Sequence, residues 1–248
     1  MNNLKLIVEY DGTDFFGWQT QEGKRTVEEI VEKTLSDVLK EHIKLEASGR
    51  TDKGVHAKAQ VCSFTCERNF DFERLPYATN YLLPSDISLI SCAQMPDDFH
   101  ARFSSKRKTY EYTFFCGQIR SPLKERYALR VPFEVDENLM KKASKLFEGT
   151  HDFSSFVVSK SKKENCERTI YSCNLTKEND LYKLNICGNG FLHNMVRIIA
   201  GTILDVGVGK IKPEQILEIL ESKNRSYAGK TLPPNGLCLL SVDYEVRG

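Results

Sequence analysis

The sequence lacks any long apolar run, which excludes a helix that crosses a membrane. Its longest strongly apolar stretch is interrupted by Arg197 and Asp205, and too few uncharged residues remain between them to span a bilayer. The N-terminal segment also lacks the basic region, apolar core and small-residue cleavage site of a secretory signal. We therefore expect a cytoplasmic protein.

The spacings that hold metals and nucleotide phosphates are missing as well. The 248 residues include eight cysteines, but no CxxC pair and no His-x-x-x-His partner accompanies them. Reduced, mostly buried thiols and no metal site are expected. No Walker-type loop is present, which disfavours an enzyme that acts on free nucleotides.

Positive and negative charges almost balance in this chain, whose formal net charge is +1. This argues against a protein that holds nucleic acid by global attraction, so a polyanionic partner would have to meet local patches. Two basic runs offer such patches, although each alone is also typical of a solvated face. They are Arg102, Lys106, Arg107 and Lys108, and then Arg120, Lys124, Arg126 and Arg130.

What is present indicates an ordinary globular protein, with 40% hydrophobic and 28% charged residues. Alternating and helical apolar spacings predict the same order of elements twice. A capping box at residues 26–29 is expected to open the first helix. The elements expected in the first half are strand 4–10, a helix with apolar positions over 27–39, strands 43–47 and 60–66, helix 72–83 and strand 87–92.

The second half restarts the pattern after Ser104. Its expected elements are strand 108–116, helix 137–147, strands 169–175 and 181–187, helices 191–204 and 213–221, and strand 237–246. We therefore predict an α+β fold of two similar βαββαβ, ferredoxin-like or RRM-like halves, 1–104 and 105–248. Their largely antiparallel sheets would flank a central RNA-binding cleft. The third strands lack the RRM glycine-aromatic consensus, which disfavours a simple single-strand reader.

The segment from Gly49 to Ala57, GRTDKGVHA, carries the densest group of reactive side chains in the chain. Glycines let its backbone turn sharply and let a ligand come close. Asp52 is its only acid, and an ionised carboxylate can act as nucleophile, as general base or as a stabiliser of positive charge on a sugar. Arg50 can brace Asp52 or hold a phosphate. The alternative is a polar hairpin loop.

A second candidate is the apolar helix expected over 191–204, which carries His193 and Arg197 one turn apart. A buried arginine needs an acid or a phosphate, so Arg197 is expected to find one, or to form an internal ion pair with Asp205. The turn at residues 188–190 is expected to leave free backbone donors at the helix start.

Aromatic side chains stand beside basic ones at two further places. Tyr110 follows the basic run 106–108, a combination that suits stacking on a base while its phosphates are held. The segment from Phe99 to Phe103 has the same mixed character. In both cases a core-facing aromatic is the alternative.

Together these segments resemble the tRNA pseudouridine synthases of the TruA kind. The resemblance covers nearly the whole chain in order, and the match of the loop 49–57 is highly specific. The segments that carry it are residues 8–13 and 17–19, the loop 49–57, residues 99–103, residues 188–197, and residues 236–237 with 242–244.

The resemblance implies the roles of the site residues. Asp52 would be the essential carboxylate of the isomerisation, and Arg197 the arginine that pairs with it. Tyr110 would pack on the target base, and Arg50 would assist its extrusion from the stack. His100, Arg102, Lys106 and Lys108 are further candidates for tRNA contacts.

The resemblance also implies the substrate and partners. Uridines 38, 39 and 40 of the tRNA anticodon stem-loop would be isomerised by a homodimer, without a cofactor or metal. A homodimer would let modest basic patches add up across two subunits. The alternative is a non-catalytic tRNA-binding or folding protein on the same scaffold.

Overall fold

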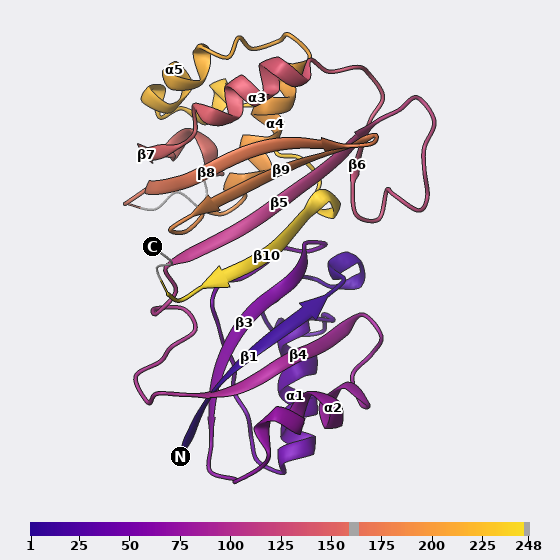
Figure 1. Cartoon of the computed structure of the whole chain (residues 1–248), viewed down its shortest axis with the longest axis vertical. Coiled ribbons are helices and arrows are strands. Elements are labelled where there is room, and N and C mark those ends of the chain that lie inside the picture. The colour runs from indigo at the N-terminus through magenta and orange to yellow at the C-terminus, as the bar shows by residue number, and fades with distance from the viewer. Residues whose placement is uncertain (159–163, 246–248) are drawn as a thin grey trace. The chain divides into compact units, whose positions relative to one another are not determined.

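The computed structural model describes residues 1–158 and 164–245. The chain divides into two compact units. Unit 1 is Met1–Lys106 with the C-terminal segment from Cys238, and unit 2 is Arg107–Leu237. Each unit combines a mostly antiparallel sheet with helices packed against it (Figure 1). The predicted α+β class is confirmed.

Unit 1 contains the strand order that the βαββαβ pattern predicts. Strand β1 lies between β3 and β4 and is antiparallel to both, while the short β2 pairs with β3 at Ser63 and Cys62. The elements are β1 (Asn2–Tyr10), η1 (Gly12–Asp14), α1 (Val27–Leu39), β2 (Glu46–Ala47), β3 (His56–Cys66), η2 (Phe72–Arg74), α2 (Leu75–Asn80), β4 (Ile87–Met95) and β10 (Leu237–Asp243).

Strand β10 extends this sheet from the other end of the chain. Cys238 and Leu239 pair in parallel with His56 and Ala57, the first residues of β3. The sequence places this strand in the second half, over 237–246. In the structure it ends at Asp243, and Val246 lies outside the described residues. The C-terminal strand therefore supports the point where the loop 49–57 enters the sheet.

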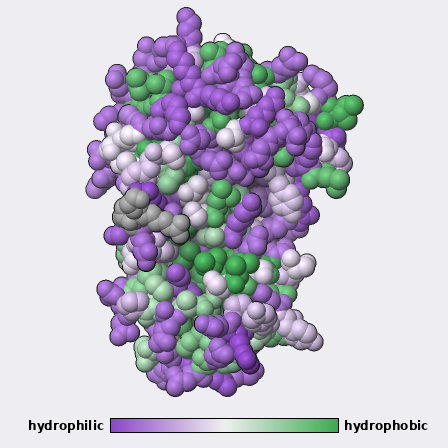
Figure 2. Space-filling model, in the orientation of Figure 1, coloured by the Kyte–Doolittle hydropathy of each residue, from purple (hydrophilic) through white to green (hydrophobic). Residues whose placement is uncertain are grey.

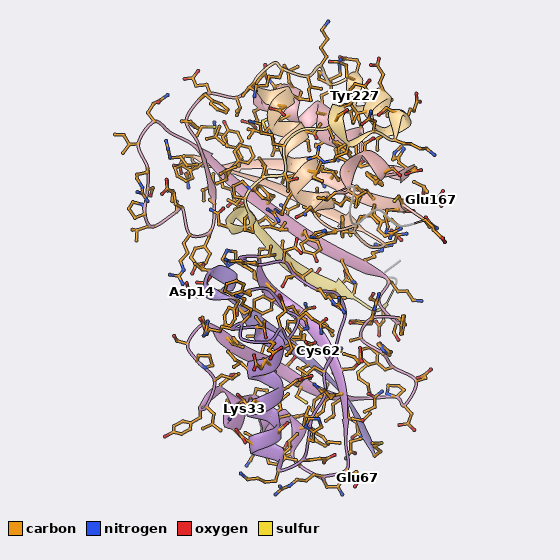
Figure 3. All side chains as sticks on the ribbon, turned by 180° about the vertical axis from the view of Figure 1, so that it is seen from behind. Asp14, Lys33, Cys62, Glu67, Glu167 and Tyr227 are labelled. Atoms are coloured by element: carbon orange, nitrogen blue, oxygen red, sulfur yellow. The ribbon has the colours of Figure 1, made fainter. Side chains whose placement is uncertain are left out.

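Helix α1 covers one face of the unit 1 sheet. Val31, Leu35 and Leu39 are fully or almost fully buried, each contributing about 2 kcal/mol of apolar burial. Lys33 on α1 is exposed, whereas Cys62 on β3 is fully buried (Figure 3). Burial raises the pKa of the Cys62 thiol, and the nearby carboxylates on α1 add to the shift.

The start of α1 differs from the expected capping box, because the Thr26 side chain makes no capping hydrogen bond. The first amides of the helix donate instead to the backbone of an earlier segment. Val27 N donates to Gly17 O at 3.3 Å, and Glu28 N donates to Trp18 O at 3.0 Å. Tertiary contacts thus replace the local cap.

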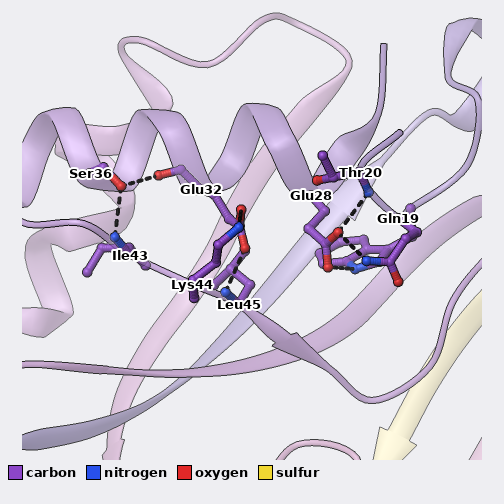
Figure 4. Close-up of polar contacts among 9 residues, drawn as sticks. Gln19, Thr20, Glu28, Glu32, Ser36, Ile43, Lys44 and Leu45 are labelled. Carbon is purple, nitrogen blue, oxygen red and sulfur yellow. Dashed lines mark hydrogen bonds and ion pairs between the residues drawn. The ribbon is translucent and has the colours of Figure 1, made fainter. Parts of the chain in front are cut away.

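The strand expected over 43–47 is reduced to two residues, because side chains of α1 capture its backbone donors. Ile43 N donates to Ser36 Oγ and Leu45 N to Glu32 Oε1, both at 2.9 Å (Figure 4). These donors are therefore not available to a neighbouring strand. The helix expected over 72–83 is likewise shorter, formed by η2 and the six residues of α2.

Unit 2 contains the antiparallel order β5-β9-β8-β7, with β6 parallel to β5. Tyr112 and Phe114 of β5 are buried, and Phe114 stacks on Tyr182 of β9 with ring centroids 5.0 Å apart. The elements are β5 (Arg107–Cys116), β6 (Leu129–Val131), α3 (Glu137–Lys145), β7 (Gly149–Asp152), η3 (Ser154–Phe156), β8 (Glu167–Glu178), β9 (Leu181–Gly188), α4 (Met195–Gly207), α5 (Gln215–Ser222), η5 (Arg225–Tyr227) and η6 (Pro234–Gly236).

Helix α4 begins four residues later than expected, at Met195 instead of Phe191. Asn194 adopts the left-handed region with φ 63°, which stops the helix from continuing toward the N-terminus. His193 therefore lies outside the helix, and the pairing of His193 with Arg197 on one helical face is wrong. The turn at residues 188–190 does not border the helix start either.

No helix in the described ranges is long and apolar enough to cross a bilayer. Most of the face in Figure 2 is hydrophilic, with apolar residues scattered over it. Scattered exposed apolar residues are normal for a globular surface.

The Tyr112 hydroxyl provides a test of the unit 2 core. It donates to Pro233 O at 2.8 Å from a side chain that is fully buried, and burial raises the pKa of this phenol. Tyr112→Phe is expected to lower the free energy of unfolding by about 1 kcal/mol, because it leaves this carbonyl without its donor. Urea unfolding measures the change. Tyr171→Phe, at a ring that is 45% exposed, is the control and should have no effect.

Candidate active site

The loop that carries Asp52 connects β2 to β3 and is only partly exposed. Thr51 and Val55 are buried, Asp52 is half-buried, and Arg50 and Lys53 are exposed. His56 and Ala57 already belong to β3. The backbone of the loop is therefore fixed in the protein while the side chain of Asp52 still reaches its surface.

The loop is held by the segment that follows β1. Trp18 N donates to Thr51 O at 3.0 Å, and Gly54 N donates to Phe15 O at 3.3 Å. The Tyr10 hydroxyl lies 2.7 Å from Thr51 Oγ1, in hydrogen-bond contact. These bonds lie on both sides of Asp52 in the chain, so they restrict the backbone of this residue.

Two glycines make the close approach of these segments possible. A Cβ on Gly12 would lie 2.0 Å from Val55 O, and a Cβ on Gly17 would lie 2.7 Å from Thr51 O. Gly17 also has a φ of +95°, which other residues rarely adopt. Glycine is therefore required at both positions for the loop to pack as it does.

A histidine joins the end of the loop to the start of η1. Gly12 N donates to Nδ1 of the buried His56 at 3.0 Å, and Asp11 Oδ1 lies 3.1 Å from the same nitrogen. The entry to the loop is fixed in a similar way. Gln60 Nε2 donates to Gly49 O at 2.7 Å, and its Oε1 accepts from Ser48 Oγ at 2.9 Å.

Two lysine side chains lie over the ring of Phe16, in the segment that holds the loop 49–57. Lys53 Nζ lies 4.1 Å from the centre of the Phe16 ring, and Lys24 Nζ lies 4.7 Å from it. Arg50 is exposed, whereas Asp52 two residues later is half-buried. The partly exposed ring of Phe16 with its two lysines therefore presents positive charge and an aromatic ring, which suits a nucleic-acid ligand.

Tyr110 and Arg197 belong to unit 2. Tyr110 on β5 is 9% exposed and contacts the edge of the Phe191 ring, with centroids 5.2 Å apart. Arg197 is half-buried, and its Nε donates to Leu232 O at 2.7 Å while its Nη1 donates to Asn194 Oδ1 at 2.6 Å. These bonds fix the guanidinium on the first turn of α4.

Asp205, the internal acid considered for Arg197, forms an ion pair with Lys210, whose Nζ lies 3.2 Å from Asp205 Oδ1. The remaining candidates for tRNA contacts lie in residues 100–106 and on β5. The rings of His100 and Phe103 are 4.4 Å apart, with Arg102 exposed beside them. Lys106 is exposed, and Lys108 pairs with Gly188 across β5 and β9.

The predicted site residues are thus distributed over both units. Asp52, Arg50, His100, Arg102 and Lys106 belong to unit 1, whereas Tyr110, Lys108 and Arg197 belong to unit 2. In the ranges 1–158 and 164–245 no group of three or more His, Cys, Asp or Glu residues is arranged to hold a metal ion.

Sequence reasoning missed the residues that support the loop. Gly12, Gly17, Trp18 and His56 lie in segments that carry the family resemblance, but no role was derived for them. The sequence does contain one signal for a close approach of the backbone, which is the pair of glycines after the first strand, Gly12 and Gly17. Their contacts with residues 51–56 are long-range and do not follow from local patterns.

A family profile described as "tRNA pseudouridine synthase" matches residues 6–104 and 143–245, and this family consists of isomerases that act on tRNA uridine. The protein is therefore an RNA-modifying isomerase by class. The chain belongs to the tRNA pseudouridine synthase family, as the sequence predicted.

Relatives named tRNA pseudouridine synthase A match almost end to end. The relative from Caldicellulosiruptor saccharolyticus is 47% identical over 244 residues, covering 98% of this chain and 100% of its own. The relative from Bacillus subtilis is 43% identical, covering 98% and 99%. A crystal structure of an archaeal box H/ACA sRNP Nop10-Cbf5 complex aligns with a TM-score of 0.36 at 15% identity, covering 81% of this chain and 43% of that one.

The close approach at Gly17 is testable by substitution. Gly17→Ala is expected to lower the free energy of unfolding by about 3 kcal/mol, since the methyl group meets Thr51 O at a positive φ. Gly23 has a φ of +65° and open space around it. The control Gly23→Ala should therefore cost only about 1 kcal/mol. Equal losses in urea unfolding would show that the packing against the loop is unimportant.

Proposed function

We propose that this protein isomerises uridine to pseudouridine at positions 38, 39 and 40 of the tRNA anticodon stem-loop, with Asp52 as the essential carboxylate. The observation that carries the proposal is the match of 98% of the chain to tRNA pseudouridine synthases. The assignment to Asp52 is supported by a loop whose backbone is fixed on both sides of this residue.

The chemistry exchanges one bond of the nucleoside for another. The bond between ribose C1′ and uracil N1 breaks, the base turns, and a bond forms between C1′ and C5. The proton on C5 is then lost and N1 gains one, so atoms and charge balance. Asp52 supports this by one of two routes. It attacks C1′ as N1 leaves, and the ester bond so formed breaks when C5 bonds to C1′; or it removes a ribose proton as N1 leaves and returns that proton to the ribose when C5 bonds to C1′. Neither route requires a metal or a cofactor.

Other residues would bind and position the uridine. In this proposal Tyr110 packs on the target base, Arg197 pairs with Asp52, and Arg50 assists extrusion of the base from the stem. The exposed position of Arg50 supports its role toward RNA. The proposal thus assigns the catalytic carboxylate to an N-terminal half, 1–104, and the tyrosine and arginine to a C-terminal half, 105–248.

The assembly and its surroundings form the last part of the proposal. The net charge of +1 is too small for strong binding of tRNA by one subunit, so a homodimer that combines two sets of basic patches fits the substrate. Candidate contacts in each subunit are His100, Arg102, Lys106 and Lys108. The cytoplasm, where tRNA is processed, is the expected compartment.

Asp52→Asn tests the catalytic assignment. The variant keeps the size of the side chain but loses the ionised carboxylate, so release of the C5 hydrogen from tRNA uridine should fall by at least about a thousandfold. Binding of tRNA should survive. Release of tritium from 5-tritiated uridine in tRNA measures the activity.

Asp97→Asn, at an exposed carboxylate outside the loop, is the matched control and should remain fully active. Undiminished activity in Asp52→Asn would exclude the mechanism. If the native protein itself produced no new nucleoside in unmodified tRNA, the non-catalytic alternative would be correct.

The site of modification is tested in cells that lack the protein. Pseudouridine should disappear from tRNA positions 38 to 40 and return when the native chain, but not Asp52→Asn, is supplied. Mapping of pseudouridine in total tRNA provides the measurement. Loss at other positions would retain the reaction and overturn the substrate assignment.

A further inference from the structure

We propose that Glu28 is a positioning residue for Asp52, and that it acts through the segment Gly17–Thr20. This inference rests on the proposed function, because it takes Asp52 as the catalytic carboxylate. Glu28 lies in the first turn of α1 and outside the loop 49–57. It therefore influences the reaction without contact with the substrate.

The first observation is the number of donors that Glu28 gathers. Its carboxylate accepts from Trp18 Nε1 at 3.2 Å, Gln19 Nε2 at 2.9 Å and Thr20 N at 2.7 Å (Figure 4). Glu28 itself is only 7% exposed. A buried carboxylate with three donors from one segment fixes both the backbone and the side chains of that segment.

The second observation is the contact of the same segment, residues 17–20, with the loop 49–57. Trp18 N donates to Thr51 O at 3.0 Å, and Trp18 O accepts from Glu28 N at 3.0 Å. One residue thus joins the start of α1 to the residue immediately before Asp52. Movement of residues 17–20 would be transmitted to the peptide that carries the catalytic carboxylate.

Packing alone does not require a carboxylate at position 28. A buried charge is costly unless its hydrogen bonds are satisfied, and an apolar side chain would fill the space at lower cost. The hydrogen bonds of Glu28 come from residues 18–20, so its contribution is to hold a particular conformation of that segment.

Glu32, one helical turn later, provides a matched control. It makes the same kind of contact, accepting from Leu45 N at 2.9 Å and pairing with Lys44 Nζ at 3.0 Å (Figure 4). Its contacts hold residues 44–45, whereas those of Glu28 hold the segment bonded to Thr51. A general effect of losing a glutamate contact on α1 would appear equally in both variants.

Trp18 provides a spectroscopic readout, because it is the only tryptophan in the chain. Its ring is fully buried and its indole N–H donates to Glu28. The emission spectrum of the native protein therefore reports this one hydrogen bond and its surroundings. Loss of the bond in a folded variant should shift the emission maximum.

The experiment compares Glu28→Ala, Glu28→Gln and Glu32→Ala in the full-length protein, with steady-state kinetics on unmodified tRNA. Glu28→Ala is expected to lower kcat about tenfold or more while KM for tRNA stays within about twofold, because misplacement of a reacting group affects the chemical step. Glu28→Gln retains one acceptor oxygen and should lie between Glu28→Ala and the native enzyme. Glu32→Ala should keep kcat within about twofold and the native emission spectrum.

Equal losses of kcat in Glu28→Ala and Glu32→Ala would overturn the proposal, as would a shift of Trp18 emission with an unchanged kcat. If Glu28→Ala does not fold, Glu28→Asp decides, because it keeps the charge but withdraws the oxygens from their donors. A lowered kcat with shifted emission supports the role, and a native kcat contradicts it. If the proposed function itself is wrong, Asp52→Asn will be active. That result distinguishes failure of the proposed function from failure of the role of Glu28.

Discussion

The hydrogen bond from Trp18 N to Thr51 O is the interaction on which the candidate active site depends. It joins two loops of unit 1 by their backbones, next to the residue that presents the carboxylate. Backbone bonds of this kind place Asp52 more precisely than side-chain contacts can, because the main chain has fewer rotatable bonds between donor and acceptor. The approach is possible only because Gly17 has no Cβ to meet Thr51 O.

The rest of unit 1 supports this contact from several directions. Helix α1 holds the segment 17–20 through its own first amides and through Glu28. Strand β3 continues directly from the loop, and β10 pairs with its first residues, His56 and Ala57. A loop between two regular elements thus becomes rigid, while Asp52 remains half-buried and accessible. This combination supports the role proposed for Asp52, because a reacting group must be held in place while it stays accessible.

Much of this architecture follows from local patterns in the sequence. The alternation in strands β1, β5 and β9 and the apolar stripe of α1 were sufficient to place these elements. The predictions were wrong where a single residue or a contact from another segment decided the outcome. Helix α4 begins at Met195 because Asn194 takes a left-handed conformation, and the strand expected over 43–47 is reduced to two residues because Ser36 and Glu32 bind amides of its first part. Thr26 does not cap α1 because the backbone of Gly17 and Trp18 receives the first helical amides.

The sequence alone determined the α+β class, the family and the choice of Asp52 as the candidate carboxylate. These depend on residue types and on their order along the chain, which need no coordinates. Only the tertiary structure decided how Asp52 is held, because Gly12, Gly17 and Glu28 act on residues 51–56 from far along the chain. Gly12 and Gly17 act by letting two backbone segments approach closely, and Glu28 acts by accepting hydrogen bonds from the segment that is bonded to Thr51. The order of residues along the chain does not show which segments meet in space.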